Sequence, residues 1–330
     1  MSKIDVVREY RLKHPDLPNL KLARIIYNEN NLLFNNVESV RSMLRRLEGQ
    51  NGKQNRRKGV KDKSLYREEP RPNNPYNLPQ SDETEYLPFV IKGYKKIGIM
   101  SDVHLPYHNI PAVTASIDYF KNEKIDALLL NGDTLDCHHL SRFMKDPKKR
   151  DFKHELDTFK AFIEILKKEL DCKIFFKVGN HDARYEKFLL EKAHELRGIE
   201  EFEFENIIKA RANGIEIIKS NQYMKLNSLN GIHGHEYIGG ISAPVNVARG
   251  LYLRGKVSAF QGHNHSTSEH SETDMNGKIT TTWSIGCLCE LSPDYMPLNK
   301  WNHGCAMVEL DPNGEDFEFH NKRIYKGKML

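Results

Sequence analysis

The sequence has no apolar run long enough to cross a membrane. No stretch of its 330 residues approaches the ~20 consecutive apolar residues of a spanning helix, and the N-terminus MSKIDVVREY has no signal-peptide apolar core. Cysteine is scarce, with five residues and no Cys-x-x-Cys pair, which argues against a disulfide framework or a cysteine-rich zinc site. The sequence therefore predicts a soluble protein of the reducing cytoplasm with no membrane partner.

Charge is abundant but unevenly distributed. Charged residues make up 29% of the chain, and the formal net charge is +5. Residues 1–71 contain 17 Lys/Arg and 9 Asp/Glu, whereas the remainder contains 33 and 36. The basic excess thus belongs to the N-terminal fifth, which indicates a polyanionic partner for that part of the chain.

Three short helical patterns precede residue 50. The second covers Leu20–Tyr27, and the third begins after Asn36, a plausible N-cap, and ends before Gly49. Three small helices with a basic last helix resemble a helix-turn-helix unit, whose last helix enters the DNA major groove. The alternative is a three-helix cap with a solvated arginine face. The basic residues of the third helix are Arg41, Arg45 and Arg46.

Composition divides the chain into three parts. Residues 1–49 form a small helical module, residues 50–88 are a basic and then proline-rich linker, and residues 89–330 are the main domain. A basic run next to a basic helix is typical of segments that follow phosphates, so we expect it to bind nucleic acid, most simply DNA. The run includes Arg56, Arg57 and Lys58.

Seven residues of metal-ligand type lie in five short motifs, SDVH, NGDTLD, VGNHD, GIHGH and QGHNH. Short apolar runs that are typical of buried strands precede four of them, at 97–100, 125–130, 174–178 and 257–260. Ligands at strand ends lie where α/β sheets place their sites. Carboxylate, imidazole and carboxamide ligands together suit a pair of borderline divalent ions. The seven residues are Asp102, His104, Asp133, Asn180, His233, His263 and His265.

The pattern of elements from residue 97 onward is that of an α/β domain. Strand patterns alternate with helical patterns at about 110–122, 151–170 and 183–196. After Gly198 the pattern shifts toward short strands, at 215–219, 279–283 and 306–310.

The five motifs, in this order, resemble the calcineurin-like metallophosphoesterase superfamily, of a phage or bacterial type. The resemblance implies two packed mixed β-sheets flanked by helices and a pair of divalent ions, with manganese the first choice and iron, zinc or nickel as alternatives. One ion would be held by Asp102, His104, Asp133 and His265, and the other by Asp133, Asn180, His233 and His263. In His-Gly-His, His235 is the alternative to His233.

The resemblance also implies a catalytic dyad. His181 would stabilise the scissile phosphate or protonate the leaving oxygen, and Asp136 would orient the imidazole, although Asp136 could instead be a turn cap. Cys137-His138 stands where one branch of the family has Arg-Gly, so a phosphate-binding arginine must come from elsewhere. Arg142 and Arg184 are the candidates, with an ordinary surface arginine as the alternative at each position.

The expected activity is hydrolysis of phosphodiester bonds by a hydroxide held between the two metals. The basic N-terminus favours nucleic acid as the substrate, which would make the protein a DNA nuclease. A phosphatase or phosphodiesterase for nucleotides, cyclic nucleotides or phosphoproteins, with a protein-docking N-terminal arm, is the alternative. A DNA-binding protein with a structural metal cluster is a third possibility, disfavoured by the retained His181 and Asp136. The sequence indicates neither the oligomeric state nor the polarity of cleavage.

Overall fold

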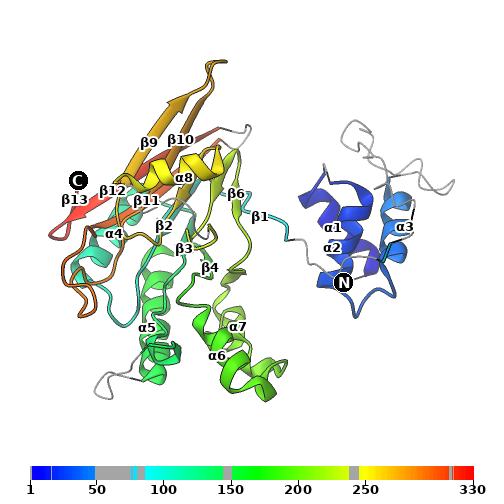
Figure 1. Cartoon of the computed structure of the whole chain (residues 1–330), viewed down its shortest axis with the longest axis horizontal. Helices are drawn as coiled ribbons and strands as arrows, with labels where there is room; N and C mark the ends of the chain where they lie inside the picture. Colours follow the sequence, from blue (N-terminus) through cyan, green and yellow to red (C-terminus); the bar gives the residue numbers. More distant parts are fainter. Residues whose placement is uncertain are drawn as a thin grey trace. The chain divides into compact units, whose positions relative to one another are not determined.

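The chain divides into two compact units, Met1–Leu87 and Pro88–Leu330 (Figure 1). The computed structural model describes residues 2–15, 17–48, 76, 78–79, 86–143, 151–237, 245–311, 314 and 316–330. Most of the predicted linker, with Gly49, Arg56, Arg57 and Lys58, lies outside the described residues. Each unit is described by itself.

The first unit contains three helices, α1 (Lys3–Lys13), α2 (Asn19–Glu29) and α3 (Val37–Leu47). Asn36 caps α3 as predicted, because its side chain accepts a hydrogen bond from the Ser39 amide. The connection from α2 to α3 spans residues 30–36, longer than the 3–4-residue turn of a helix-turn-helix motif. The core of this unit contains Val7, Leu22, Ile26, Val40 and Leu44, all fully buried.

A buried ion pair, which the sequence did not predict, ties the three helices together. Arg11 on α1 is only 1% exposed, and its Nη2 lies 2.7 Å from Oε1 of Glu48, the residue that follows α3. Its Nη1 donates to the Leu17 carbonyl at 2.6 Å, and Asn19 at the start of α2 donates to Glu48 Oε2. A buried charge is tolerated only when it is paired and hydrogen-bonded in this way.

The arginines of α3 differ in how far their side chains are exposed to solvent. The Arg41 side chain is only 13% exposed and pairs with Glu38 at 3.3 Å. Arg45 is half-buried, and Arg46 is exposed. The basic face predicted for this helix is therefore carried by Arg45 and Arg46.

The second unit consists of two mixed β-sheets packed face to face and flanked by helices, as predicted (Figure 1). The six-stranded sheet has the order β1 (Phe89–Val90), β6 (Met224–Leu226), β7 (Leu229–Gly231), β8 (Ala259–Gln261), β10 (Ile279–Ser284) and β9 (Ser268–Thr273). The seven-stranded sheet has the order β13 (Lys328–Met329), β12 (Phe317–Tyr325), β11 (His303–Leu310), β2 (Lys96–Met100), β3 (Ala127–Asn131), β4 (Lys173–Lys177) and β5 (Glu216–Ile218). The helices are α4 (Ile110–Glu123), α5 (Phe152–Leu170), α6 (Arg184–Lys192), α7 (Phe204–Ile207) and α8 (Val247–Gly255).

The apolar runs before the motifs form the parallel strands β2, β3 and β4 at the centre of the larger sheet. Side chains alternate between its two faces. In β3, Leu129 packs in the core between the two sheets, whereas Leu128 and Leu130 pack beneath the helices. Both faces are covered, which is why these runs are continuously apolar. Among the described helices, none is both long and apolar enough to cross a membrane.

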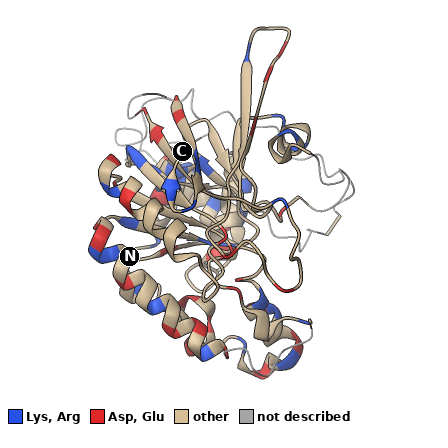
Figure 2. Ribbon diagram, turned by 90° about the vertical axis from the view of Figure 1, so that its left-hand side faces the viewer, with Lys and Arg blue, Asp and Glu red and all other residues tan. Residues whose placement is uncertain are grey.

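Element boundaries differ from the predictions by a few residues at several places, for example at β11, which begins at His303 rather than at residue 306. The predicted strand at 257–260 begins only at Ala259, because α8 ends at Gly255 and Lys256 caps it in the left-handed conformation. The predicted helix at 183–196 ends at Lys192, and a separate 3₁₀ turn follows at His194–Leu196. Acidic and basic residues are interleaved along the helices and strands of this unit (Figure 2). Their numbers nearly balance, with a slight acidic excess in the sequence beyond residue 71.

Candidate metal centre

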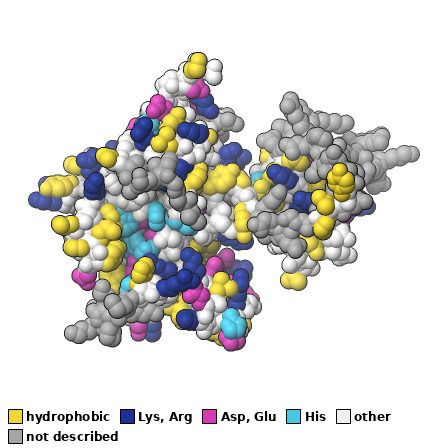
Figure 3. Space-filling model, viewed as in Figure 1, with side chains coloured by type: hydrophobic (Ala, Val, Ile, Leu, Met, Phe, Trp, Pro, Cys, Tyr) yellow, Lys and Arg dark blue, Asp and Glu magenta, His cyan; other side chains and the backbone are white. Residues whose placement is uncertain are grey.

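The five motifs meet at one edge of the two sheets. SDVH, NGDTLD and VGNHD follow the carboxyl ends of β2, β3 and β4, and GIHGH and QGHNH follow β7 and β8. Histidine side chains gather on one face of the second unit (Figure 3). The structure therefore brings together the seven residues predicted as ligands.

One group of ligand atoms surrounds Asp102. The Nε2 atoms of His104 and His265 lie 3.2 Å apart, and Asp102 Oδ1 lies 3.2 Å from His265 Nε2. Asp133 Oδ2 lies 3.9 Å from His104 Nε2. These four side chains are the set that the resemblance implied for the first ion.

A second group lies on the other side of Asp133. His233 Nε2 lies 3.2 Å from both Asp133 Oδ2 and Asn180 Oδ1. Ligand atoms of Asp133, His233 and His263 all lie within 4.8 Å of one another. Asp133 thus contributes to both groups, as a bridging carboxylate would.

The donor set fits divalent cations. Asp102 Oδ1 is buried and has no hydrogen-bond partner among the described residues, although an imidazole nitrogen lies beside it. If His104 and His265 are both neutral with unprotonated Nε2 atoms, two lone pairs face each other across 3.2 Å beside a carboxylate. These electron-rich atoms repel one another, which has an electrostatic cost. A cation bound between these atoms would remove that cost. The imidazole, carboxylate and carboxamide donors suit manganese, iron, zinc or nickel.

The backbone at the centre is strained. Asp102, His104, Asp133, His263 and His265 all have positive φ, between 49° and 64°. Residues other than glycine adopt this conformation rarely, and it persists only where the surrounding structure enforces it. Five of the seven predicted ligands therefore occupy strained positions, a pattern that is typical of functional sites.

Glycines near the ligands are required for space. A methyl group at Gly262 would overlap Ser101 Oγ, and one at Gly179 would overlap the Asp133 side chain. The positive φ angles of this loop lie at His263 and His265, so Gly262 is required for space rather than for its backbone freedom. Gly262 allows the loop to approach β2 closely.

Outer hydrogen bonds orient the imidazoles. His104 Nδ1 lies 2.9 Å from Asp136 Oδ1, and His233 Nδ1 lies 2.8 Å from the Asn131 carbonyl oxygen. His265 Nδ1 lies 3.9 Å from the Cys289 thiol. Each contact leaves Nε2 facing the centre, which is the usual arrangement of a metal-binding histidine. The contacts of His104 with Asp136 and of His265 with Cys289 were not predicted.

Electrostatics keeps the carboxylates of the centre ionised. Burial opposes ionisation of Asp133, but the neighbouring imidazoles of His233 and His181 hold its pKa well below the usual range. Burial likewise opposes protonation of His233, and the negative charge of Asp133 overcomes it, raising the His233 pKa to about 10. In the metal-free protein the carboxylates and His233 thus stabilise each other's charged forms, and a bound cation would have to displace the imidazole proton.

The predicted dyad lies beside these groups. Asp136 Oδ1 lies 3.0 Å from His181 Nδ1, so one carboxylate oxygen contacts both His181 and His104. Arg184 Nη1 donates to the Asp136 carbonyl at 2.8 Å, and its Nη2 lies 3.0 Å from His181 Nε2. Arg184 therefore reaches the centre.

Arg142, the other predicted phosphate-binding residue, lies in a different environment. Its guanidinium pairs with Glu191 on α6, and its side chain is 84% exposed. The two arginine candidates thus differ, because Arg184 contacts the dyad whereas Arg142 is engaged by a surface carboxylate.

Supporting residues hold the ligand loops. Asp182 accepts hydrogen bonds from the amides of Asp133, Leu135 and Gly179 at 2.8–2.9 Å. The other histidine of GIHGH, His235, contacts Ser220 Oγ at 3.0 Å, whereas His233 faces Asp133.

The loop that carries His233 is anchored by a buried ion pair that the sequence did not predict. Lys177, at the end of β4, has a fully buried side chain, and its Nζ lies 3.0 Å from Glu236 Oε1. Glu236 in turn accepts hydrogen bonds from the amides of His233 and Gly234. A lysine that ends an apolar strand run was the available signal.

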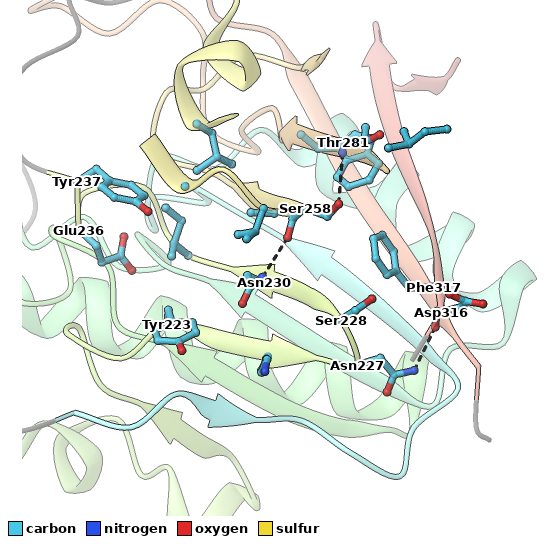
Figure 4. Close-up of a pocket in the computed structure, with 18 of the residues that line it drawn as sticks. Tyr223, Asn227, Ser228, Asn230, Glu236, Tyr237, Ser258, Thr281, Asp316 and Phe317 are labelled. Carbon is cyan, nitrogen blue, oxygen red and sulfur yellow. Dashed lines mark hydrogen bonds between the residues drawn. The ribbon is translucent and has the colours of Figure 1, made fainter. Parts of the chain in front are cut away.

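A separate cavity of about 970 Å³ lies on the six-stranded sheet (Figure 4). Its lining includes residues of β6, β7, β8 and β10, and none of the seven predicted ligands. Two asparagines that line it already make hydrogen bonds within the protein. Asn227 donates to the carbonyls of Asp311 and Asp316, and Asn230 donates to the carbonyl of Ser258. The cavity is therefore distinct in composition from the metal centre.

Comparison with known proteins extends these observations. The family model described as calcineurin-like phosphoesterase matches residues 95–280. The Gene 54 protein of Mycobacterium phage L5 is 25% identical over 231 residues, which cover 66% of this chain and 89% of the phage protein.

Two solved structures are also similar. Vacuolar protein sorting 29 of Cryptosporidium parvum has 12% identity and a TM-score of 0.39, covering 72% of this chain and 95% of its own. A dimetal phosphatase from Danio rerio has 12% identity and a TM-score of 0.34, covering 72% and 98%. All seven predicted ligands lie within the residues that the family model matches.

Proposed function

Because the chain belongs to the calcineurin-like phosphoesterase family, we propose that this hydrolase cleaves phosphodiester bonds of nucleic acid, with DNA as the expected substrate. The family is dimetal-dependent, and the chain carries groups of residues that can hold metal ions. The observation that carries the proposal is Asp133, whose carboxylate lies between two groups of ligand atoms.

The two ions would be held as the resemblance implies. Asp102, His104, Asp133 and His265 would hold one, and Asp133, Asn180, His233 and His263 the other. When bound, such a pair supplies a nucleophile from water at neutral pH and neutralises charge on the phosphate. Manganese is our first choice, because the donor set combines nitrogen and oxygen.

The remaining groups would act on the substrate. Asp136 holds His181 through Nδ1, which leaves Nε2 available to protonate the leaving oxygen. In the structure Arg184 donates to this Nε2, so the guanidinium would have to turn from the imidazole to a phosphate oxygen when the diester binds. Arg184 would thus neutralise charge on the phosphate, and His181 would transfer the proton to the leaving oxygen.

Support for nucleic acid comes from the N-terminal part of the chain. Residues 1–71 carry a large excess of Lys/Arg, and Arg46 on α3 is exposed. Basic residues of this kind bind phosphates without regard to sequence. The five cysteines, all free, are in keeping with the cytoplasm as the compartment that we propose.

Two observations favour the alternative of a phosphoester other than nucleic acid. The packed Arg41 and the long connection between α2 and α3 depart from a DNA-binding helix-turn-helix. In this alternative the substrate is a nucleotide, a cyclic nucleotide or a phosphoprotein, and the first unit docks another protein.

The deciding experiment assays the full chain loaded with Mn²⁺ on supercoiled, linear and single-stranded DNA, and on bis(p-nitrophenyl) phosphate. We expect cleavage of DNA and of the small ester, and loss of both in Asp133→Asn, which removes the charge shared by the two ligand groups. Turnover of the small ester without cleavage of any DNA would replace the nuclease by the alternative. Retention of activity by Asp133→Asn would contradict the two-metal mechanism itself.

A further inference from the structure

Three aromatic rings form a row that leads outward from a predicted metal ligand. The rings of His265 and Trp301 have centroids 4.1 Å apart at an interplanar angle of 61°. The rings of Trp301 and Tyr295 follow, 6.3 Å apart at 64°. Trp301 is half-buried, whereas Tyr295 is 70% exposed. The row thus begins within the metal centre and ends in solvent.

The segment between β10 and β11 holds the two outer rings in place. Asn299 donates to the Leu291 carbonyl at 2.6 Å and accepts from the Trp301 amide at 2.9 Å. The amide of Asn302 donates to the His265 carbonyl at 2.9 Å. These bonds fix the loop to itself and to the motif that carries the ligand, so the loop does not have to be ordered when a ligand binds.

Tyr295 is the outermost of the three rings. The pKa of its hydroxyl is raised to about 12, first by partial burial and next by the negative charge of Asp136. The rest of the ring is accessible, and it does not belong to a hydrophobic core cluster among the described residues. An exposed aromatic ring that contacts the partner ring of a predicted metal ligand, on a loop held by its own hydrogen bonds, has the properties of a binding surface.

We propose that Trp301 and Tyr295 form an aromatic subsite that binds the nucleobase next to the scissile phosphate. The inference rests on the proposed phosphodiesterase function and adds the feature of the substrate that the site recognises. Bases stack on aromatic side chains without strong sequence preference, and loss of one such contact corresponds to about 5- to 150-fold in affinity. Trp301 is the inner wall, fixed against His265, and Tyr295 is the outer platform.

The test uses two diesters that release the same p-nitrophenolate, thymidine 5′-(p-nitrophenyl) phosphate and methyl p-nitrophenyl phosphate. In the full chain loaded with Mn²⁺, Tyr295→Ala should raise KM for the thymidine ester about 5- to 150-fold and leave KM for the methyl ester unchanged. Tyr295→Phe, which keeps the ring, should behave like the wild type. Leu298→Ala removes another exposed apolar side chain of the same loop and serves as the matched control.

The outcomes are distinct. An unchanged KM for the thymidine ester in Tyr295→Ala, or an equal rise for both esters, would overturn the base-binding subsite. A rise confined to the thymidine ester, rescued by phenylalanine, would support it. Wild-type protein that holds two metals yet turns over neither ester would overturn the proposed function, whatever the variants do. The metal content of each variant, measured by elemental analysis, shows that the centre has remained intact.

Discussion

At the scale of single residues, Asp136 has the most connected position in the site. Its Oδ1 contacts Nδ1 of both His104, a predicted ligand, and His181, the predicted proton donor. The resemblance implied only the second contact. The same carboxylate therefore orients a metal ligand and a catalytic imidazole, and its removal should affect both metal binding and turnover.

The two functions of Asp136 can be separated by mutation. We expect His181→Ala to keep both metals and to lose about 10²–10⁴-fold in turnover, because it removes proton transfer alone. Asp136→Asn should lose turnover and also weaken metal binding by about 10–100-fold, because it removes the charge that orients His104. Elemental analysis and metal titration measure the binding, and initial rates measure turnover.

His194→Ala is the matched control for this pair, because His194 is an isolated histidine with a 73% exposed side chain. It should change neither quantity. Loss of metal from His181→Ala, or full activity in that variant, would contradict the role assigned to His181.

At the scale of elements, α5 holds the turn that follows β3. Glu155, in the first turn of α5, is buried and accepts a hydrogen bond from the Cys137 amide at 2.5 Å. Burial and then the negative charges of Asp136 and Asp182 raise the pKa of Glu155 to about 8, from an ordinary value of 4.5. The folded protein thus holds a proton that the unfolded chain releases.

This difference makes stability depend on pH. Between pH 4.5 and about pH 8 the unfolded chain has an ionised Glu155 and the folded chain a protonated one, so stability falls as pH rises through that window. Glu155→Gln keeps an acceptor for Cys137 and removes the titration. We expect the Tm of Glu155→Gln relative to wild type to increase from pH 5 to pH 8, as calorimetry would measure.

The slope that Glu155 contributes is at most about 1.4 kcal/mol per pH unit. The exposed Glu164→Gln on the same helix should show no such trend. A Tm difference that stays constant with pH, or that shrinks as pH rises, would show that Glu155 is ionised in the folded protein.

At the scale of the whole molecule, basic charge and catalytic groups belong to different parts of the chain. The predicted ligands all lie in the second unit, where acidic and basic residues are interleaved (Figure 2). The basic excess lies in residues 1–71. If DNA is the substrate, affinity and chemistry should therefore be separable, with affinity carried by the N-terminal part.

The salt dependence of binding provides the measurement. With cleavage prevented by EDTA, we expect DNA affinity of the full chain to fall steeply as salt rises. Arg46→Ala should reduce the slope of log K against log salt by about one, because one phosphate contact is lost. Lys168→Ala removes an 82% exposed charge from α5 and should leave the slope unchanged. Equal effects of the two variants would argue against binding through α3.

Much of the second unit could be predicted because its signals are local. The apolar runs of β2, β3 and β4 are buried on both faces, and each ends in a motif of ligand-type residues. In the first unit the N-cap Asn36 could be predicted for the same reason, because its hydrogen bond lies within one helical turn. Boundaries were less accurate, as at Ala259, because the end of α8 decides where β8 can begin.

The residues that the sequence did not predict make contacts between distant segments. Arg11 pairs with Glu48, Lys177 with Glu236, and Trp301 packs edge-on against His265, each across a separation that periodicity cannot detect. The two phosphate-binding candidates also required the fold. Arg142 and Arg184 both follow a motif, but only tertiary packing shows Arg142 paired with Glu191 and Arg184 beside His181.

The sequence by itself determined the order of strands and motifs, and hence which residue types stand at the strand ends, because strand periodicity and apolar runs are properties of neighbouring residues. Only the tertiary structure decided that Asp136 contacts a second imidazole, that of His104, and that an aromatic row leads from His265 to solvent. Those relations depend on the close approach of loops from both sheets. Glycines without room for a side chain and ligands with strained backbones make that approach possible.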